Sequence, residues 1–236
     1  MALNDGDRIL FWLDRVTGHA MRRGGSGSTG HPEFKTNIIN SLPVARFNNS
    51  EFLVGSGSMM SDLVGKTGYT FFIVMSNISD SSFGAFLARD ASGSRGFNTF
   101  VNNDNTMRYY VPTGGSISSQ RSTQSIETGG PLIISGVYDG GTSRQDVYIN
   151  GVLDNLDSPT PPATFASLGA TEWRVGNDGF SDLLDGDMAE FLFWDRALTD
   201  NEFNKVYAAL STKYLIPPGN ITSGLIGWFE AEDGTS

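Results

Sequence analysis

Three acidic side chains lie within six residues of one another, at Asp185, Asp187 and Glu190. Two carboxyl groups ~5 Å apart in one cleft can serve as acid and nucleophile in a retaining glycosidase. On a regular strand, however, Asp185 and Asp187 share a face and Glu190 points the opposite way, so this chemistry would require a β-bulge. We therefore interpret the segment as a solvent-side loop that enters a core strand, and we assign no catalytic residue.

Oxygen-bearing side chains gather in the same region and raise the question of a metal site. Calcium binds six to eight oxygen atoms, which carboxylates often supply together with backbone carbonyl groups. The spacing of the acidic residues matches no EF-hand loop. We assign no cofactor and no metal, and we keep calcium as an alternative, with Asp178, Asp182 and Asp185 as its candidate ligands.

Aromatic and polar residues in expected rim loops suit the recognition of a glycan. Aromatic rings stack on the faces of sugars, while Asn and Asp side chains form hydrogen bonds with the hydroxyl groups. An adjacent pair such as Tyr109 and Tyr110 would place one ring in the core if it lay on a strand. The predicted ligand contacts are Tyr109, Asn177, Asp178, Phe180 and Asp182.

Other motifs fail when their surroundings are considered. Residues 25–30 fit the pattern G-x-G-x-x-G, but no helix is predicted after them, as a dinucleotide site requires. Both histidines lie in the glycine-rich segment 15–36, and the chain has no G-x-S-x-G or H-E-x-x-H sequence. The sequence therefore indicates neither a nucleotide site nor a serine hydrolase or zinc protease.

The composition excludes several partners. The 236 residues include 26 Asp and Glu against 16 Lys and Arg, a net charge of −10, so a nucleic-acid partner is not expected. The absence of cysteine excludes disulfides and thiolate metal sites. No stretch approaches the ~20 apolar residues of a membrane-spanning helix, and the N-terminus does not resemble a signal peptide. We expect a protein without a membrane partner that is made without a signal peptide.

The spacing of apolar residues predicts many short strands separated by turns. Asn150 and Gly151 form the preferred dipeptide of a type I′ hairpin turn. Residues 15–36 are expected to form a long surface loop. The predicted strands are residues 8–14, 44–47, 52–54, 69–76, 83–89, 96–101, 107–111, 132–138, 146–149, 172–175, 188–194 and 225–230.

One amphipathic helix is predicted near the C-terminus. Apolar residues recur there with a period of about 3.6 residues, and Thr199 with Glu202 fits a capping box. Pro217 and Pro218 are expected to stop the helix. The residues of its apolar face are Phe203, Val206, Tyr207, Leu210 and Tyr214.

Residues 1–216 are predicted to form one domain, and residues 217–236 a linker followed by a strand. The apolar segment 225–230 resembles the segment 10–14. It is either the closing strand of the same sandwich or the opening strand of a second domain, and we slightly favour the second alternative. Such a strand could also pair with the sheet edge of a neighbouring subunit.

The ordered motifs resemble those of the concanavalin A-like lectin/glucanase superfamily, in its laminin G-like branch. This resemblance, which covers residues 8–216, implies an all-β fold: a two-sheet antiparallel jelly-roll sandwich with one short helix. It makes residues 187–190 a signature of the fold. Members bind glycans or proteins, and some bind calcium at the rim. The motifs are Ser135-Gly136-Val137-Tyr138-Asp139-Gly140, Val147-Tyr148-Ile149-Asn150-Gly151-Val152, Trp173-Arg174-Val175-Gly176, Gly186-Asp187-Met188-Ala189-Glu190-Phe191 and Ala197-Leu198-Thr199-Asp200-Asn201-Glu202.

These observations favour a non-enzymatic recognition or structural module. We expect a virion surface protein, either a capsid decoration or a tail or fibre component, or a protein of the extracellular surface. Its expected partners are other proteins of an assembly, a cell-surface glycan, or both, and we expect an oligomer. The alternatives are a glycoside hydrolase or polysaccharide lyase on the same fold, and a scaffold that docks through residues 225–230.

Overall fold

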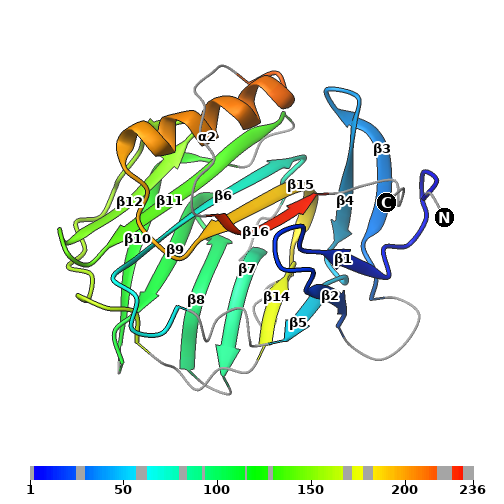
Figure 1. The fold of residues 1–236 in the computed structure, drawn as a ribbon. Coiled ribbons are helices and arrows are strands. Elements are labelled where there is room, and N and C mark those ends of the chain that lie inside the picture. Colours follow the sequence, from blue (N-terminus) through cyan, green and yellow to red (C-terminus); the bar gives the residue numbers. More distant parts are fainter. Residues whose placement is uncertain are drawn as a thin grey trace.

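Two antiparallel sheets pack face to face, and one helix covers the outer side of one of them (Figure 1). This arrangement confirms the predicted all-β sandwich with a short helix near the C-terminus. No described helix is long and apolar enough to cross a membrane. The computed structural model describes residues 3–24, 30–56, 63–79, 84–91, 94–114, 116–126, 130–166, 172–177, 183–216 and 225–230.

Sheet A lies under the helix, and all of its neighbouring strands are antiparallel. Its order is β13-β12-β11-β6-β15-β4-β3, and β16 also pairs with β15. The strands are β3 (Glu33–Ile39), β4 (Leu42–Asn48), β6 (Gly68–Ser76), β11 (Leu132–Asp139), β12 (Arg144–Ile149), β13 (Val152–Leu153), β15 (Asp185–Trp194) and β16 (Leu225–Glu230).

Sheet B forms the other layer, with the order β1-β2-β5-β14-β7-β8-β9-β10. Its neighbouring strands are also all antiparallel. The strands are β1 (Phe11–Leu13), β2 (Ala20–Arg23), β5 (Leu53–Ser56), β7 (Gly84–Ala91), β8 (Ser94–Val101), β9 (Thr106–Pro112), β10 (Ile117–Ser125) and β14 (Glu172–Val175).

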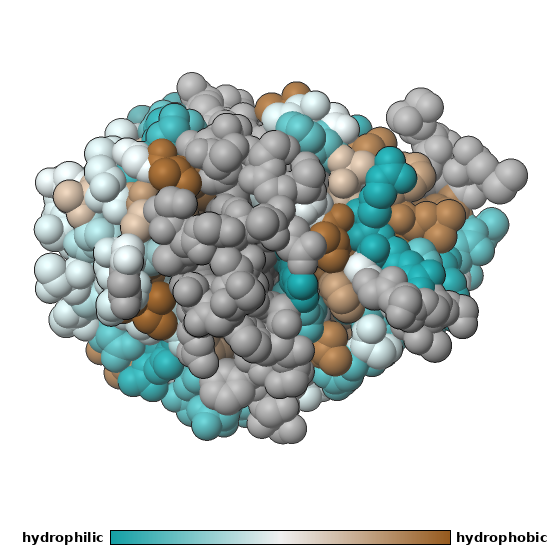
Figure 2. All heavy atoms as spheres, turned by 90° about the horizontal axis from the view of Figure 1, so that it is seen from below, coloured by the Kyte–Doolittle hydropathy of each residue, from teal (hydrophilic) through white to brown (hydrophobic). Residues whose placement is uncertain are grey.

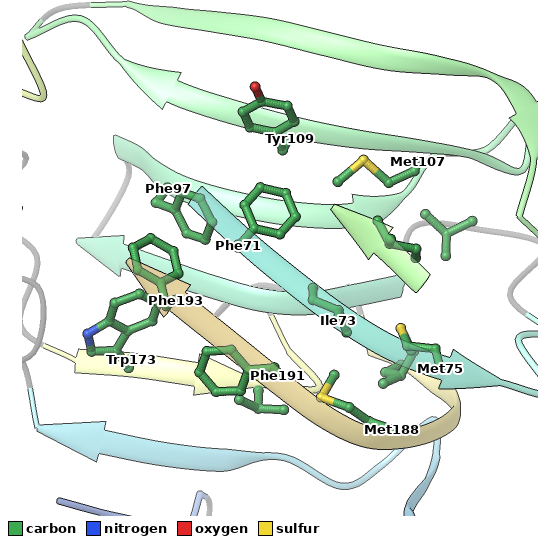
Figure 3. Close-up of a cluster of buried hydrophobic side chains, with 14 of the residues drawn as sticks. Phe71, Ile73, Met75, Phe97, Met107, Tyr109, Trp173, Met188, Phe191 and Phe193 are labelled. Carbon is green, nitrogen blue, oxygen red and sulfur yellow. The ribbon is translucent and has the colours of Figure 1, made fainter. Parts of the chain in front are cut away.

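The main core fills the space between the two sheets. Side chains from the central strands β6 and β15 of sheet A meet rings and methionines from sheet B (Figure 3). Phe193 is typical: its ring lies edge-on to Phe97 at 5.4 Å and to Trp173 at 5.6 Å, measured between ring centroids. Such edge-to-face contacts add to the free energy gained by removing the rings from water.

The helix α2 (Asp200–Lys213) buries its apolar face on the outer side of sheet A, which forms a second core. Because β6 is covered on both faces, all nine of its residues are buried. The predicted capping box is confirmed, since Thr199 and Glu202 exchange hydrogen bonds. Arg196 also pairs with Glu202, and these bonds hold the pKa of that carboxyl group at about 2.

The end of the helix differs from the prediction. The helix stops at Lys213, Tyr214 is its C-cap, and Leu215 adopts a positive φ of 56°. This left-handed residue turns the chain before the two prolines, which lie outside the described residues.

The predicted hairpin at Asn150 and Gly151 is confirmed. Both residues have positive φ, 49° and 76°, as a type I′ turn requires. A Cβ atom on Gly151 would lie 2.6 Å from the ring of Tyr207 on α2. The turn therefore needs glycine both for its backbone conformation and for the close approach of the helix.

We expect Gly151→Ala to lower the free energy of unfolding by more than the ~1 kcal/mol of a strained φ alone. Urea denaturation measures the loss. Gly18→Ala is the matched control, because Gly18 also has a positive φ, 73°, but a Cβ there meets no atom within 4 Å. Equal losses in the two variants would show that the contact with Tyr207 contributes nothing.

The predicted strands are wrong where the sequence is polar. Segment 15–36, expected to be a loop, contains β2 and the start of β3. The strand β10 was not predicted, because its inward side chains are serine and glutamine. Ser118 Oγ donates to Gln145 Oε1 at 2.6 Å, and Gln120 Nε2 donates to the carbonyl of Gln145 at 2.8 Å. These bonds link sheet B to β12 of sheet A where an apolar pattern is missing.

The C-terminal strand β16 belongs to sheet A in this structure. It runs antiparallel to β15 and pairs with residues 190–194. Residues 185–188 of β15 pair with β4 instead. This pairing is the arrangement that the closing-strand alternative describes. The division of the chain at residue 216 stays a prediction.

Candidate functional site

The carboxylate of Asp187 is fully buried and serves the fold. It accepts hydrogen bonds from Arg46 Nε at 2.7 Å, Arg46 Nη2 at 2.8 Å and Asn77 Nδ2 at 2.6 Å. Arg46 lies directly opposite Asp187 on β4. The pair compensates the buried charge and ties β4 to β15.

Glu190 lies on the same side of β15 as Asp187, contrary to the expectation for a regular strand. The register against β6 shifts between Met188 and Glu190, which is a β-bulge. The bulge turns Glu190 toward α2, where it accepts a hydrogen bond from Tyr214 Oη at 2.8 Å and pairs with Lys213 Nζ at 3.2 Å. Burial, followed by the nearby carboxylate, raises the pKa of Tyr214.

Neither carboxylate of this segment is therefore placed to reach a substrate. Asp187 is 0% exposed and Glu190 is 2% exposed. Each is held by a cationic partner, and each joins β15 to another element. The interpretation of residues 187–190 as a signature of the fold agrees with these contacts.

The predicted ligand contact Tyr109 lies in the core, and this part of the prediction needs correction. Its side chain is 0% exposed, and its hydroxyl donates to the carbonyl oxygens of Val137 at 2.9 Å and Asp146 at 3.0 Å. Alternate residues of β9 face the core, so Tyr109 points inward and Tyr110 points outward. The sequence expectation that one tyrosine of the pair faces the core is confirmed.

Of the other predicted contacts, only one lies among the described residues. Asn177 is described and accepts a hydrogen bond from Arg174 Nη1 at 2.9 Å. Asp178, Phe180 and Asp182 lie outside the described residues. Their role in ligand binding stays a prediction.

Of the three candidate calcium ligands, only Asp185 is described. Its carboxylate accepts a hydrogen bond from Asn49 Nδ2 at 3.2 Å. The described part of the chain contains no group of three or more residues suited to a metal ion. Calcium at Asp178, Asp182 and Asp185 remains a hypothesis.

The outer face of sheet B, turned away from the core, collects side chains that the sequence does not reveal as a group. A single cross-strand row runs over all eight strands, so its members lie on one face. Figure 2 shows the molecule from below the view of Figure 1, and hydrophilic and hydrophobic residues alternate in small groups on the part that is not grey. The row is Phe11, Arg22, Val54, Arg174, Ala88, Asn98, Tyr110 and Ser119.

At one end of this face the side chains are open to solvent. Phe11 is 53% exposed, and Arg22 beside it is also exposed. Further along the row, the guanidinium group of Arg174 lies 5.6 Å from the centroid of the Phe52 ring. The same group donates to Asn177, which is 5% exposed.

At the other end, four residues of β8 and β9 form a compact group of two aromatic and two polar side chains. Asn98 lies opposite Tyr110, and Phe100 lies opposite Arg108. The rings of Phe100 and Tyr110 are 5.1 Å apart in an edge-to-face arrangement. We call Asn98, Phe100, Arg108 and Tyr110 the β8–β9 quartet.

Two polar atoms of the β8–β9 quartet are buried without a hydrogen-bond partner among the described residues: Asn98 Oδ1 and Arg108 Nε. A buried polar group left in this state costs about 1–3 kcal/mol, so native proteins rarely keep one without a reason. One atom is an acceptor and the other a donor, and the hydroxyl groups of a sugar can both donate and accept.

The neighbouring Arg121, in contrast, is fully engaged in ion pairs. It lies opposite Arg108 on β10 and contacts Asp104 at 3.1 Å and Asp157 at 3.0 Å. Burial raises the pKa of Asp104, but hydrogen bonds from Thr106 and Asn102 and the charge of Arg121 outweigh it and lower the pKa to about 2. Asp104 and Asp157 therefore pair with Arg121.

The geometry of this face suits binding. Arginine, amide and aromatic side chains lie together on this face of sheet B, and the buried carboxylates of β15 lie on the other sheet. Sugar-binding sites combine apolar or aromatic surface with a few placed polar groups.

A family comparison agrees with this fold. A model of the concanavalin A-like lectin/glucanase superfamily matches residues 54–204. The chain belongs to this superfamily, and the family predicted from the motifs is confirmed. The comparison with curated proteins gives no match.

Solved structures with similar folds include lectin-like domains of several proteins. The binding domain of botulinum neurotoxin DC, in complex with SialylT, has a TM-score of 0.57 and 11% identity; the match covers 85% of this chain and 50% of that one. A candidate carbohydrate-binding protein of Bacteroides ovatus ATCC 8483 has a TM-score of 0.53 and 15% identity, with 81% and 52% covered. Domain 4 of an extracellular arabinanase from Geobacillus stearothermophilus, in complex with arabinotriose, has a TM-score of 0.51 and 14% identity, with 76% and 80% covered.

These identities are low, so the likeness concerns the fold. The chain spans about half the length of the neurotoxin and Bacteroides structures. The domain thus has a lectin-like fold of the concanavalin A-like type.

Proposed function

We propose that this domain is a non-enzymatic recognition module that binds a saccharide on the outer face of sheet B. The observation that carries the proposal is the pair of unpartnered atoms, Asn98 Oδ1 and Arg108 Nε, beside the rings of Phe100 and Tyr110. A saccharide supplies both functions, because its polar groups can donate to the amide oxygen and accept from the guanidinium group.

The similar structures support a saccharide as the ligand. Two of them are described as complexes with SialylT and arabinotriose, and the third as a candidate carbohydrate-binding protein. The buried and paired states of Asp187 and Glu190 favour binding over hydrolysis. A glycoside hydrolase or polysaccharide lyase is the alternative function.

A glycan array combined with a turnover assay tests the proposal. We expect the protein to retain at least one class of saccharide and to release no product from a polysaccharide panel. Product release that disappears in Glu190→Gln, with the fold intact by circular dichroism, would establish the hydrolase or lyase instead. Retention on no saccharide would contradict the proposal.

The array is run with calcium and with EDTA, because calcium is the alternative cofactor. Under the proposal, the described groups on the outer face of sheet B need no metal, so retention is expected to survive EDTA. Retention lost in EDTA, and lost equally on replacing Asp178, Asp182 and Asp185, would move the site to those carboxylates.

The setting of the module is proposed from its composition. We infer a place on a virion or another extracellular surface, with protein partners in an assembly and an oligomeric state. Neighbouring capsid or tail genes would support this setting, and sedimentation would measure the oligomer. Neighbouring polysaccharide-utilisation genes would favour a glycan-processing system.

A further inference from the structure

The arginines of this acidic protein differ in whether a carboxylate neutralises them. The chain has 26 acidic residues against 16 basic ones, so an arginine that meets no acid is unexpected. Carboxylates pair with Arg46, Arg121, Arg144 and Arg196. No ion pair joins a carboxylate to Arg22 or Arg108 in the part of the chain that the structure describes.

Both of these arginines lie on the outer face of sheet B, and Arg174 lies between them. Arg22 and Arg174 occupy the same cross-strand row, in which both are opposite Val54 of β5. Arg108 adjoins this row on β9, opposite Phe100. With neighbouring strands ~4.8 Å apart, the five steps from β2 to β9 span about 24 Å. The two arginines without a carboxylate partner thus lie toward opposite ends of one face of the sheet.

The β8–β9 quartet is the part of this face that is removed from water. Asn98 is 8% exposed, Tyr110 and Phe100 are 3% exposed, and Arg108 Nε is buried. Electrostatic attraction is stronger where water is excluded, and a guanidinium group forms two parallel hydrogen bonds with a carboxylate or sulfate. Arg108 is therefore suited to an anionic group, and Asn98 Oδ1 to a hydroxyl on the same sugar.

We propose that the ligand of this face is an extended anionic polysaccharide. Its acidic groups lie at Arg22 and Arg108, and a hydroxyl donates to Asn98 Oδ1. The inference rests on the proposed function and adds the charge and the length of the ligand. Carboxylate and sulfate groups share this chemistry, and the arms of the experiment separate them.

The first experiment measures binding by calorimetry in EDTA to four polymers: polygalacturonate for carboxylates, dextran sulfate for sulfates, dextran as the neutral control, and single-stranded DNA as a different polyanion. We expect one of the two anionic saccharides to bind most tightly, with an affinity that falls as salt rises. Binding to dextran alone would overturn the anionic ligand and leave the proposed function standing.

Equal or tighter binding to DNA would overturn a saccharide ligand on this face. The absence of binding to every polymer would overturn the inference, and the glycan array would then decide the proposed function separately.

The second experiment uses variants that keep the shape of the site. Arg108→Gln should weaken binding of the anionic polymer by at least about tenfold, since charged hydrogen bonds are among the strongest in proteins. Lys205→Gln is the matched control, because it removes the same charge from an exposed position on α2, over the other sheet. An equal effect of the two variants would show that only the net charge matters and would overturn the site.

Asn98→Asp gives the sharpest test of the sign of the ligand charge. The variant keeps an oxygen acceptor at the same position but adds a negative charge beside the anionic group. We expect binding of the anionic polymer to be lost while the melting temperature stays within a few degrees of the wild type. Unchanged binding in a folded Asn98→Asp protein would contradict the inference, and Asn98→Ala, which only removes the acceptor, should weaken binding less.

Discussion

Replacing Asp187 by alanine is expected to destabilise the protein by about 3–5 kcal/mol, the usual cost of breaking a buried ion pair from one side. The carboxylate is 0% exposed and accepts three hydrogen bonds, from two atoms of Arg46 and from Asn77. Its removal leaves the Arg46 guanidinium and the Asn77 amide without their acceptor. Because the Arg46 side chain is 31% exposed, water relieves part of the loss, and we expect the lower part of the range.

Urea unfolding measures this cost, and two further variants interpret it. Asp195→Ala breaks an ion pair in which the Asp195 side chain is 27% exposed and the Lys66 side chain 45% exposed. Because the pair is partly solvated, its loss should cost less than about 1 kcal/mol. The double variant Arg46→Ala, Asp187→Ala should cost less than the sum of the two single variants, because the two residues interact directly. An Asp187→Ala protein as stable as the Asp195→Ala protein would refute the structural role of the pair.

Replacing Phe193 by alanine is expected to cost about 3–5 kcal/mol, the range for a large buried aromatic residue. Its ring is 1% exposed, and it contacts Tyr69 at 5.5 Å, Phe97 at 5.4 Å and Trp173 at 5.6 Å between centroids. These partners come from both sheets, so the cavity would open between the layers (Figure 3).

The matched control for this prediction is Phe11→Ala. It removes the same side chain from the exposed edge strand β1, where Phe11 is 53% exposed. We expect a change in unfolding free energy within about 0.5 kcal/mol, as is usual for surface substitutions. Similar costs at both positions would contradict the placement of Phe193 at the centre of the sandwich.

These contacts also explain which parts of the fold were predictable. The apolar runs of β6, β11 and β15, the Asn150-Gly151 turn and the capped helix α2 are local signals, and all of them are confirmed. The strand β10 gives no such signal, because its inward side chains are polar and depend on Gln145 of β12 for their hydrogen bonds. Sequence periodicity cannot show a partner that lies in another sheet.

The candidate site was predictable only in small part. Asn177 is buried beside Arg174 and its role in binding stays a prediction, whereas Tyr109 faces the core. Two adjacent tyrosines cannot be told apart by residue type. The register of the strand against its neighbours decides which of them faces outward. Arg22, Arg174 and Arg108 come from distant segments, and no spacing along the chain connects them.

The sequence by itself determined the class of fold, the place of its helix, its acidic charge and its lack of disulfides. Those properties depend on composition, turn residues and local periodicity, which can be read from the sequence without knowing which segments meet in space. Only the tertiary structure decided the roles of the acidic residues. The bulge in β15 directs the Glu190 side chain to α2, and the pairing of β15 with β4 places Asp187 opposite Arg46. Register and pairing also gathered the outer face of sheet B, because cross-strand neighbours are fixed by the folding of the whole sheet.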